Sequence, residues 1–110
     1  MLSDQERALL YWLARDYWSG SGRIIDAGCF LGGSTIALAT GLRDRADEMP
    51  PPPIVVCDRF RAEQYTVDRG WFADSGGLGV GDDFRPLFDQ NLSGFERLLD
   101  VRAGDILREE

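Results

Sequence analysis

Apolar residues recur at helical spacing in three parts of the chain. The first stretch, residues 4–18, combines leucines with aromatic residues, and Ser3 with Glu6 forms an S-x-x-E capping box at its start. Similar spacing over 34–42 and 85–93 predicts two further helices. We therefore expect an N-terminal helix that packs against the body of the fold, followed by two shorter helices.

Short runs of β-branched and apolar residues lie between these helical stretches. Residues 23–27 and 54–57 are typical of buried strands, and 99–103 predicts a third. A strand–helix–strand order implies right-handed crossovers and parallel pairing. The pattern thus predicts the α/β class, with a Rossmann-like parallel sheet and flanking helices.

The 110 residues of the chain are enough for one domain at most. Its expected parts are an N-terminal helix (1–22), a strand–turn–helix–strand unit (23–60), a loop or lid (61–84) and a third helix and strand with the start of another helix (85–110). The segment 61–84 mixes aromatic residues with a glycine-rich run and has no clear period. Such a segment is typical of a functional lid or of a disordered loop, and both readings stay open.

Composition narrows the classes of partner and chemistry. The net charge of −7 disfavours nucleic acids and anionic membranes as partners. The chain has no histidine, and all its basic residues are arginines, which excludes a P-loop lysine and a histidine metal site. Cys29 and Cys57 are expected to be buried thiols, and no metal site is expected within the chain. A polar N-terminus and the lack of a ~20-residue apolar run favour a cytoplasmic protein.

A glycine-rich turn follows the first predicted strand. It contains Asp26, Gly28, Gly32 and Gly33, and the next helix opens near Ser34. Such a turn brings bare backbone close to a ligand at a helix N-terminus. A carboxylate in the turn repels phosphate and favours an ammonium or a hydroxyl, so we expect a small ligand that carries such groups.

Three acids stand just past the ends of the three predicted strands: Asp26, Asp58 and Asp105. The carboxyl ends of parallel strands form the edge at which open sheets bind ligands. Each acid also has a structural reading. Asp26 would stabilise its turn, Asp58 would be a loop acid, and Asp105 would cap the following helix.

The ordered acids and the glycine turn resemble the motifs of class I S-adenosylmethionine-dependent methyltransferases. The D-x-G-x-x-x-G-G-S run at 26–34 resembles the first motif, and Asp58 after 54–57 resembles the second acidic position. The V-R-A-G run at 101–104 with Asp105 is similar to the third. The resemblance implies a seven-stranded fold, of which this chain supplies the first half, a helix followed by β-α-β-α-β.

One branch of that family is closer than the others. The run at 88–94, together with the G-G-S triplet, is similar to the branch related to macrocin O-methyltransferase, which acts on sugars of natural products. The likeness covers about residues 20–108. Phe30 departs from the family, because many members have a glycine there.

The resemblance implies a role for each motif in binding S-adenosyl-L-methionine. Asp26 would meet the amino group, Asp58 both ribose hydroxyls and Asp105 the adenine amino group, while Phe30 and Phe60 would flank the ligand. The cofactor-binding residues implied in this way are Asp26, Gly28, Cys29, Phe30, Gly32, Gly33, Ser34, Asp58, Arg59, Phe60, Gly104, Asp105 and Ile106.

The expected function is methyl transfer to a hydroxyl of a small-molecule acceptor, a sugar or another natural product. In the family, the acceptor-binding residues, any general base and any ligands of a divalent metal come from the other half, so no catalytic residue is predicted here. Without a fourth strand, the first strand becomes an exposed edge, which predicts either a homo-oligomer or a C-terminal half that covers it.

Two alternatives remain. The first is a truncated or degenerate module that binds cofactor or a partner without turnover. The second is an NAD-dependent Rossmann oxidoreductase, which is disfavoured because Phe30 stands at the second glycine of the G-x-G-x-x-G fingerprint.

Overall fold

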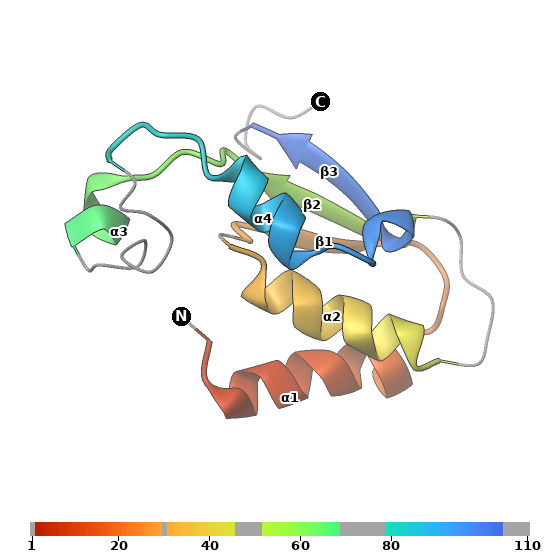
Figure 1. Ribbon diagram of the computed structural model, residues 1–110. Coiled ribbons are helices and arrows are strands. Elements are labelled where there is room, and N and C mark those ends of the chain that lie inside the picture. The colour runs from red at the N-terminus through yellow and green to blue at the C-terminus, as the bar shows by residue number, and fades with distance from the viewer. Residues whose placement is uncertain (1, 30, 46–51, 69–78, 105–110) are drawn as a thin grey trace.

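A small parallel sheet forms the centre of the molecule. The computed structural model describes residues 2–29, 31–45, 52–68 and 79–104. Within them lie β1 (Ile24–Ala27), β2 (Ile54–Asp58) and β3 (Leu99–Ala103), which pair in parallel in the order β1-β2-β3 (Figure 1). The predicted strands and their parallel pairing are confirmed.

The predicted helices are also present, with small shifts at their ends. Asp4 begins α1, which a wider π-helical turn continues to Tyr17. The helical elements in chain order are α1 (Asp4–Trp12), η1 (Leu13–Tyr17), α2 (Gly33–Arg43), α3 (Gln64–Asp68), α4 (Arg85–Asn91) and η3 (Glu96–Leu98). None of the helices in the described part of the chain is long and apolar enough to cross a membrane.

One face of the sheet carries the hydrophobic core. Helices α2 and α4 lie against this face, and α1 lies on the far side of α2 (Figure 1). The core draws on both helices and on alternate strand residues, and its largest fully buried side chains are Leu42, Ile54, Val56, Phe60, Phe88 and Leu92. The alternation places these strand residues on a single face because successive side chains of a strand point to opposite faces.

Helix α1 is capped at its start and tied to α2 near its end. The predicted capping box is confirmed, since the Ser3 hydroxyl accepts from the Glu6 backbone N–H and the Glu6 carboxylate accepts from the Ser3 N–H. The Tyr11 hydroxyl donates to Asp44 at 2.6 Å. Arg45 donates to the carbonyls of Ala14 and Trp18 at 3.1 and 2.6 Å. These bonds hold α1 and η1 in place over α2.

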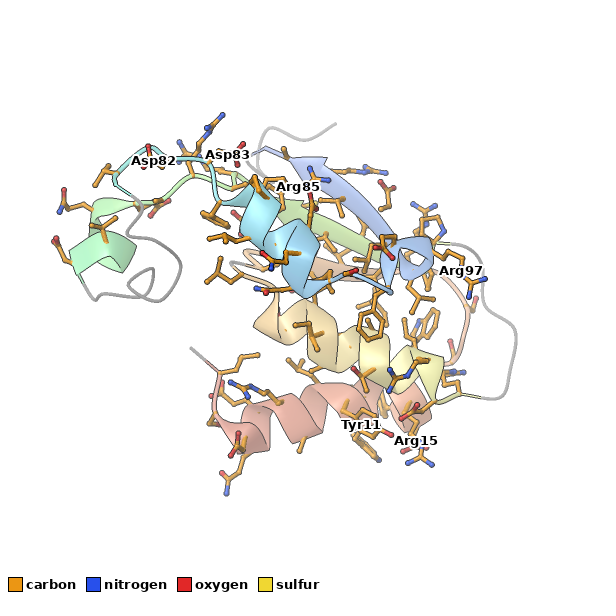
Figure 2. All side chains as sticks on the ribbon, viewed as in Figure 1. Tyr11, Arg15, Asp82, Asp83, Arg85 and Arg97 are labelled. Carbon is orange, nitrogen blue, oxygen red and sulfur yellow. The ribbon has the colours of Figure 1, made fainter. Side chains whose placement is uncertain are left out.

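The segment between β2 and α4 is closed at its base. Arg61 and Asp83 form an antiparallel bridge, and the Ala62 N–H donates to the Asp82 carbonyl at 2.8 Å. Asp82 and Asp83 lie next to the start of α4, where Arg85 is found (Figure 2). Sequence reasoning missed the short helix α3 inside this segment. Residues 69–78, on which the choice between lid and disordered loop depends, lie outside the described residues, as does the helix expected from residue 106.

Strand β1 lies at the edge of this sheet, as expected. The N–H groups of Ile24 and Gly28 donate toward β2, to Pro53 and Cys57. The N–H and C=O groups of Ile25 and Ala27 therefore point away from the sheet, because these directions alternate along a strand. Ile25 is 64% exposed and lies on the face opposite the core.

Candidate functional site

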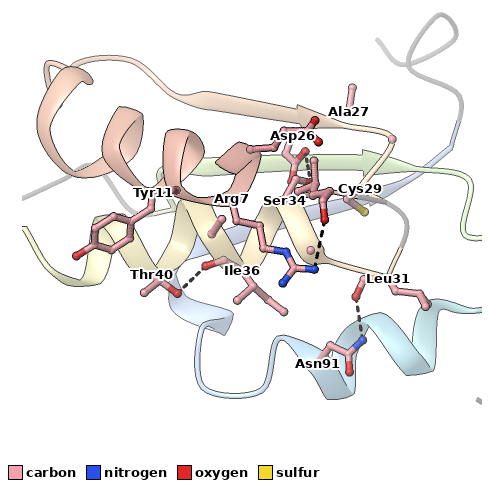
Figure 3. A pocket seen from close by; sticks show the side chains of 16 residues that line it. Arg7, Tyr11, Asp26, Ala27, Cys29, Leu31, Ser34, Ile36, Thr40 and Asn91 are labelled. Atoms are coloured by element: carbon pink, nitrogen blue, oxygen red, sulfur yellow. Dashed lines mark hydrogen bonds between the residues drawn. The ribbon is translucent and has the colours of Figure 1, made fainter. Parts of the chain in front are cut away.

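A cavity of about 1040 Å³ adjoins the carboxyl end of β1. Three elements form most of its wall: helix α1, the glycine turn after β1, and the first turns of α2 (Figure 3). Among the predicted site residues, those that line it are Asp26, Gly28, Cys29, Gly33 and Ser34. Residues from the centre of the first predicted motif thus line a single cavity, which is large enough for a small ligand.

Two glycines of the turn adopt positive φ for different reasons. Gly28 has φ 72°, and a Cβ placed there would meet nothing within 4 Å. Gly32 has φ 102°, and its Cβ would run into Leu92 and contact the Phe88 ring at 3.3 Å. Gly28 therefore leaves open space above the backbone, whereas Gly32 lets α4 pack closely against the turn.

Asp26 joins the end of β1 to the start of α2. Its side chain accepts from the Thr35 hydroxyl at 2.5 Å and from the Ser34 hydroxyl at 3.1 Å. Asp26 is only 8% exposed but still lines the cavity. Its structural reading as a residue that stabilises the turn is therefore supported. A carboxylate has about four acceptor positions, so two hydroxyl donors leave it capacity for a ligand ammonium.

Asp58 lies beside the glycine turn rather than among the residues lining the cavity. One carboxylate oxygen accepts the Phe60 N–H at 2.8 Å, and the Cys29 thiol donates to the other at 3.8 Å. Burial and the neighbouring charges of Asp58 and Asp26 raise the pKa of the Cys29 thiol. These effects favour the protonated thiol of Cys29 at neutral pH. Both cysteines are buried outside any disulfide, as predicted.

Phe60 does not flank a ligand surface, contrary to the expectation. Its ring is 1% exposed and packs against Phe84 and Phe88, with centroids 5.7 and 5.3 Å away. Its backbone has φ 57°, an uncommon value for a residue with a side chain, and the ring is placed in the core. The correction follows from this burial, which sequence position alone does not reveal.

The other predicted site residues divide into two groups. Arg59 is exposed, and the Gly104 N–H donates to the Asp58 carbonyl at 2.8 Å, which holds the turns after β2 and β3 together. Phe30, Asp105 and Ile106 lie outside the described residues. In the described part of the chain, no group of three or more acidic residues or cysteines is placed to hold a metal ion.

Sequence reasoning missed the contribution of α1 to the cavity. Glu6, Arg7 and Tyr11 line its wall from that helix, and Asn91 lines it from α4 (Figure 3). The Asn91 amide donates to the Leu31 carbonyl at 2.9 Å. The available signal was the spacing of Arg7 and Tyr11, which are four residues apart and so share one face of the helix.

Comparison of the chain with protein-family models, with curated proteins and with solved structures finds no match. The resemblance to the methyltransferases therefore rests on the residues of the chain itself.

Proposed function

We propose that this chain binds S-adenosylmethionine and forms the N-terminal part of a class I methyltransferase that methylates a hydroxyl of a sugar or another natural product. The observation that carries the proposal is the cavity after β1. It combines an acid, an open glycine turn and a helix N-terminus at the carboxyl end of a parallel strand. Open α/β sheets bind ligands at this position.

The groups around the cavity match the chemistry of this cofactor. Asp26 has acceptor capacity for the ammonium, and the open space above Gly28 admits a ligand close to the backbone. Asp58, next to Cys29 of the turn, is the candidate acceptor for two ribose hydroxyls. The order β1-β2-β3 is compatible with the first half of a seven-stranded methyltransferase sheet.

The cofactor, when bound, supplies a methyl group already activated on a sulfonium. The described residues would hold and orient it, and positioning of the acceptor contributes much of the rate. No nucleophilic side chain is required from this chain. We assign the acceptor site, any general base and any divalent-metal ligands to segments outside it. The proposal includes a cytoplasmic location, which suits two buried cysteines that form no disulfide.

Calorimetric titration with S-adenosylhomocysteine, with NAD as the control ligand, tests the proposal. We expect saturable binding of the first ligand alone. Asp58→Ala should weaken that binding by about 1–3 kcal/mol, because two hydrogen bonds to the ribose are lost. Asp58→Asn keeps an oxygen for the Phe60 N–H and separates loss of the ligand bond from damage to the turn.

The matched control is Asp89→Asn, which removes an exposed carboxylate paired with Arg85 on α4. This variant should bind S-adenosylhomocysteine as the wild type does. Equal binding of NAD, or unchanged affinity in a folded Asp58→Ala variant, would contradict the assignment.

A module without turnover is the second candidate, and the open edge of β1 favours it. Such a module would use the backbone of Ile25 and Ala27 to pair with a partner, a second copy of the chain. Sedimentation analysis tests the need for a partner. A monodisperse monomer that unfolds cooperatively would count against it.

A further inference from the structure

Arg7 reaches into the cavity from helix α1. Figure 3 shows its guanidinium directed from α1 toward the glycine turn, and one nitrogen donates to the Leu2 carbonyl at 3.4 Å. Arg7 also forms an ion pair with Asp4 at 3.7 Å, in which the Asp4 side chain is fully exposed. Exposed ion pairs of this kind contribute little to stability, so a ligand can draw the Arg7 side chain away from Asp4 at a small cost in free energy.

Three charged residues in the described part of the chain line the cavity. Arg7 supplies the positive charge on the α1 wall, and Asp26 supplies a negative charge at the end of β1. Glu6 also lines the cavity, but its carboxylate accepts the Ser3 N–H in the capping box, which lowers the pKa of Glu6. The Tyr11 hydroxyl is directed to Asp44. Arg7 and Asp26 therefore offer opposite charges from two walls of the cavity, while Glu6 places a second carboxylate on the same wall as Arg7.

An α-amino acid group carries an ammonium and a carboxylate on the same carbon, which suits such a pair of charges. The guanidinium presents a planar fork that matches a carboxylate. The N-terminus of α2, an eleven-residue helix that opens on the same cavity at Gly33, adds a favourable field for an anion.

We propose that Arg7 receives the carboxylate of the ligand's amino-acid end, while Asp26 faces its ammonium. Arg7 is then a specificity residue, which separates adenosyl ligands with an intact amino-acid group from those without the carboxylate. This inference rests on the proposed function and adds to it a residue that the sequence motifs do not contain.

The test compares S-adenosylhomocysteine with its decarboxylated analogue, which keeps the amine, by calorimetric titration. The wild type should prefer the intact ligand by about 10- to 100-fold, the range for a hydrogen-bonded charge pair. Arg7→Gln should lose this preference and bind the analogue as the wild type does. Arg7→Lys should keep part of the preference, because it retains the charge but not the fork.

Asp4→Asn is the matched control, since it removes the surface ion pair and leaves Arg7 intact. It should keep the full preference. Equal binding of both ligands by the wild type would overturn the role of Arg7 but not the proposed function. An equal loss of affinity for both ligands in Arg7→Gln would do the same. If the wild type bound neither ligand, the proposed function would fail, and the role of Arg7 with it.

Discussion

The turns after β1 and β2 begin alike and end differently. Each follows a strand whose last or penultimate residue is an aspartate, and each contains a residue with positive φ. After β1 this residue is Gly28, and the space above it is open to the cavity. After β2 it is Phe60, whose ring is buried among aromatic residues. The first turn leaves room for a ligand, and the second fills the core.

The difference shows what a positive φ costs and what offsets it. A residue with a Cβ loses roughly 1–2 kcal/mol in the left-handed region. Burial of a phenylalanine side chain contributes about 1.5–3 kcal/mol, and aromatic pairs add to it. Phe60 can therefore hold this conformation, because its packing offsets the strain. At Gly28 no packing is available, and a glycine avoids the strain.

The largest expected loss of stability comes from removing the Phe60 ring of the second turn. Phe60→Ala should lower the free energy of unfolding by about 3–5 kcal/mol, because it leaves a cavity between Phe84 and Phe88. Urea denaturation measures the loss. Val80→Ala, at a residue 55% exposed, is the control and should change stability by less than about 0.5 kcal/mol. A similar small loss for Phe60→Ala would show that its ring is not part of the core.

A smaller effect is expected at the two glycines of the first turn. Gly32→Ala should cost about 2–4 kcal/mol, because strain in φ adds to the collision with Leu92. Gly28→Ala should cost about 1–2 kcal/mol, from strain alone. Thermal and urea unfolding of both variants measure the difference. Equal losses would mean that α4 does not pack closely on Gly32.

The last of the three effects concerns the anchoring of Asp26. Thr35→Val keeps the shape of the side chain but removes the hydroxyl that donates to Asp26, which should cost about 1.5–3 kcal/mol. Ser34→Ala is the matched variant and should cost less, because its bond is longer and Ser34 is only partly buried. A greater loss for Ser34→Ala, measured by urea denaturation, would reverse the assigned roles of the two hydroxyls.

Most secondary structure could be predicted because its signals are local. The capping box at Ser3 and Glu6 involves residues three apart, and the run at 54–57 is apolar throughout. The short helix α3 was missed because its five residues show no amphipathic period against the surrounding polar segment. The candidate site was predicted in part: the glycine turn and Asp26 do line one cavity, but Phe60 does not.

By itself the sequence determined the α/β class, the parallel pairing of the strands and the place of Asp26 and Asp58 at the strand ends, because these follow from apolar periodicity and short-range chain geometry. Only the tertiary structure decided which way the side chains face. It placed Arg7 of α1 on the cavity that Asp26 lines and turned Phe60 into the core. These outcomes depend on contacts between segments distant in the chain, and no local pattern records which segments will meet.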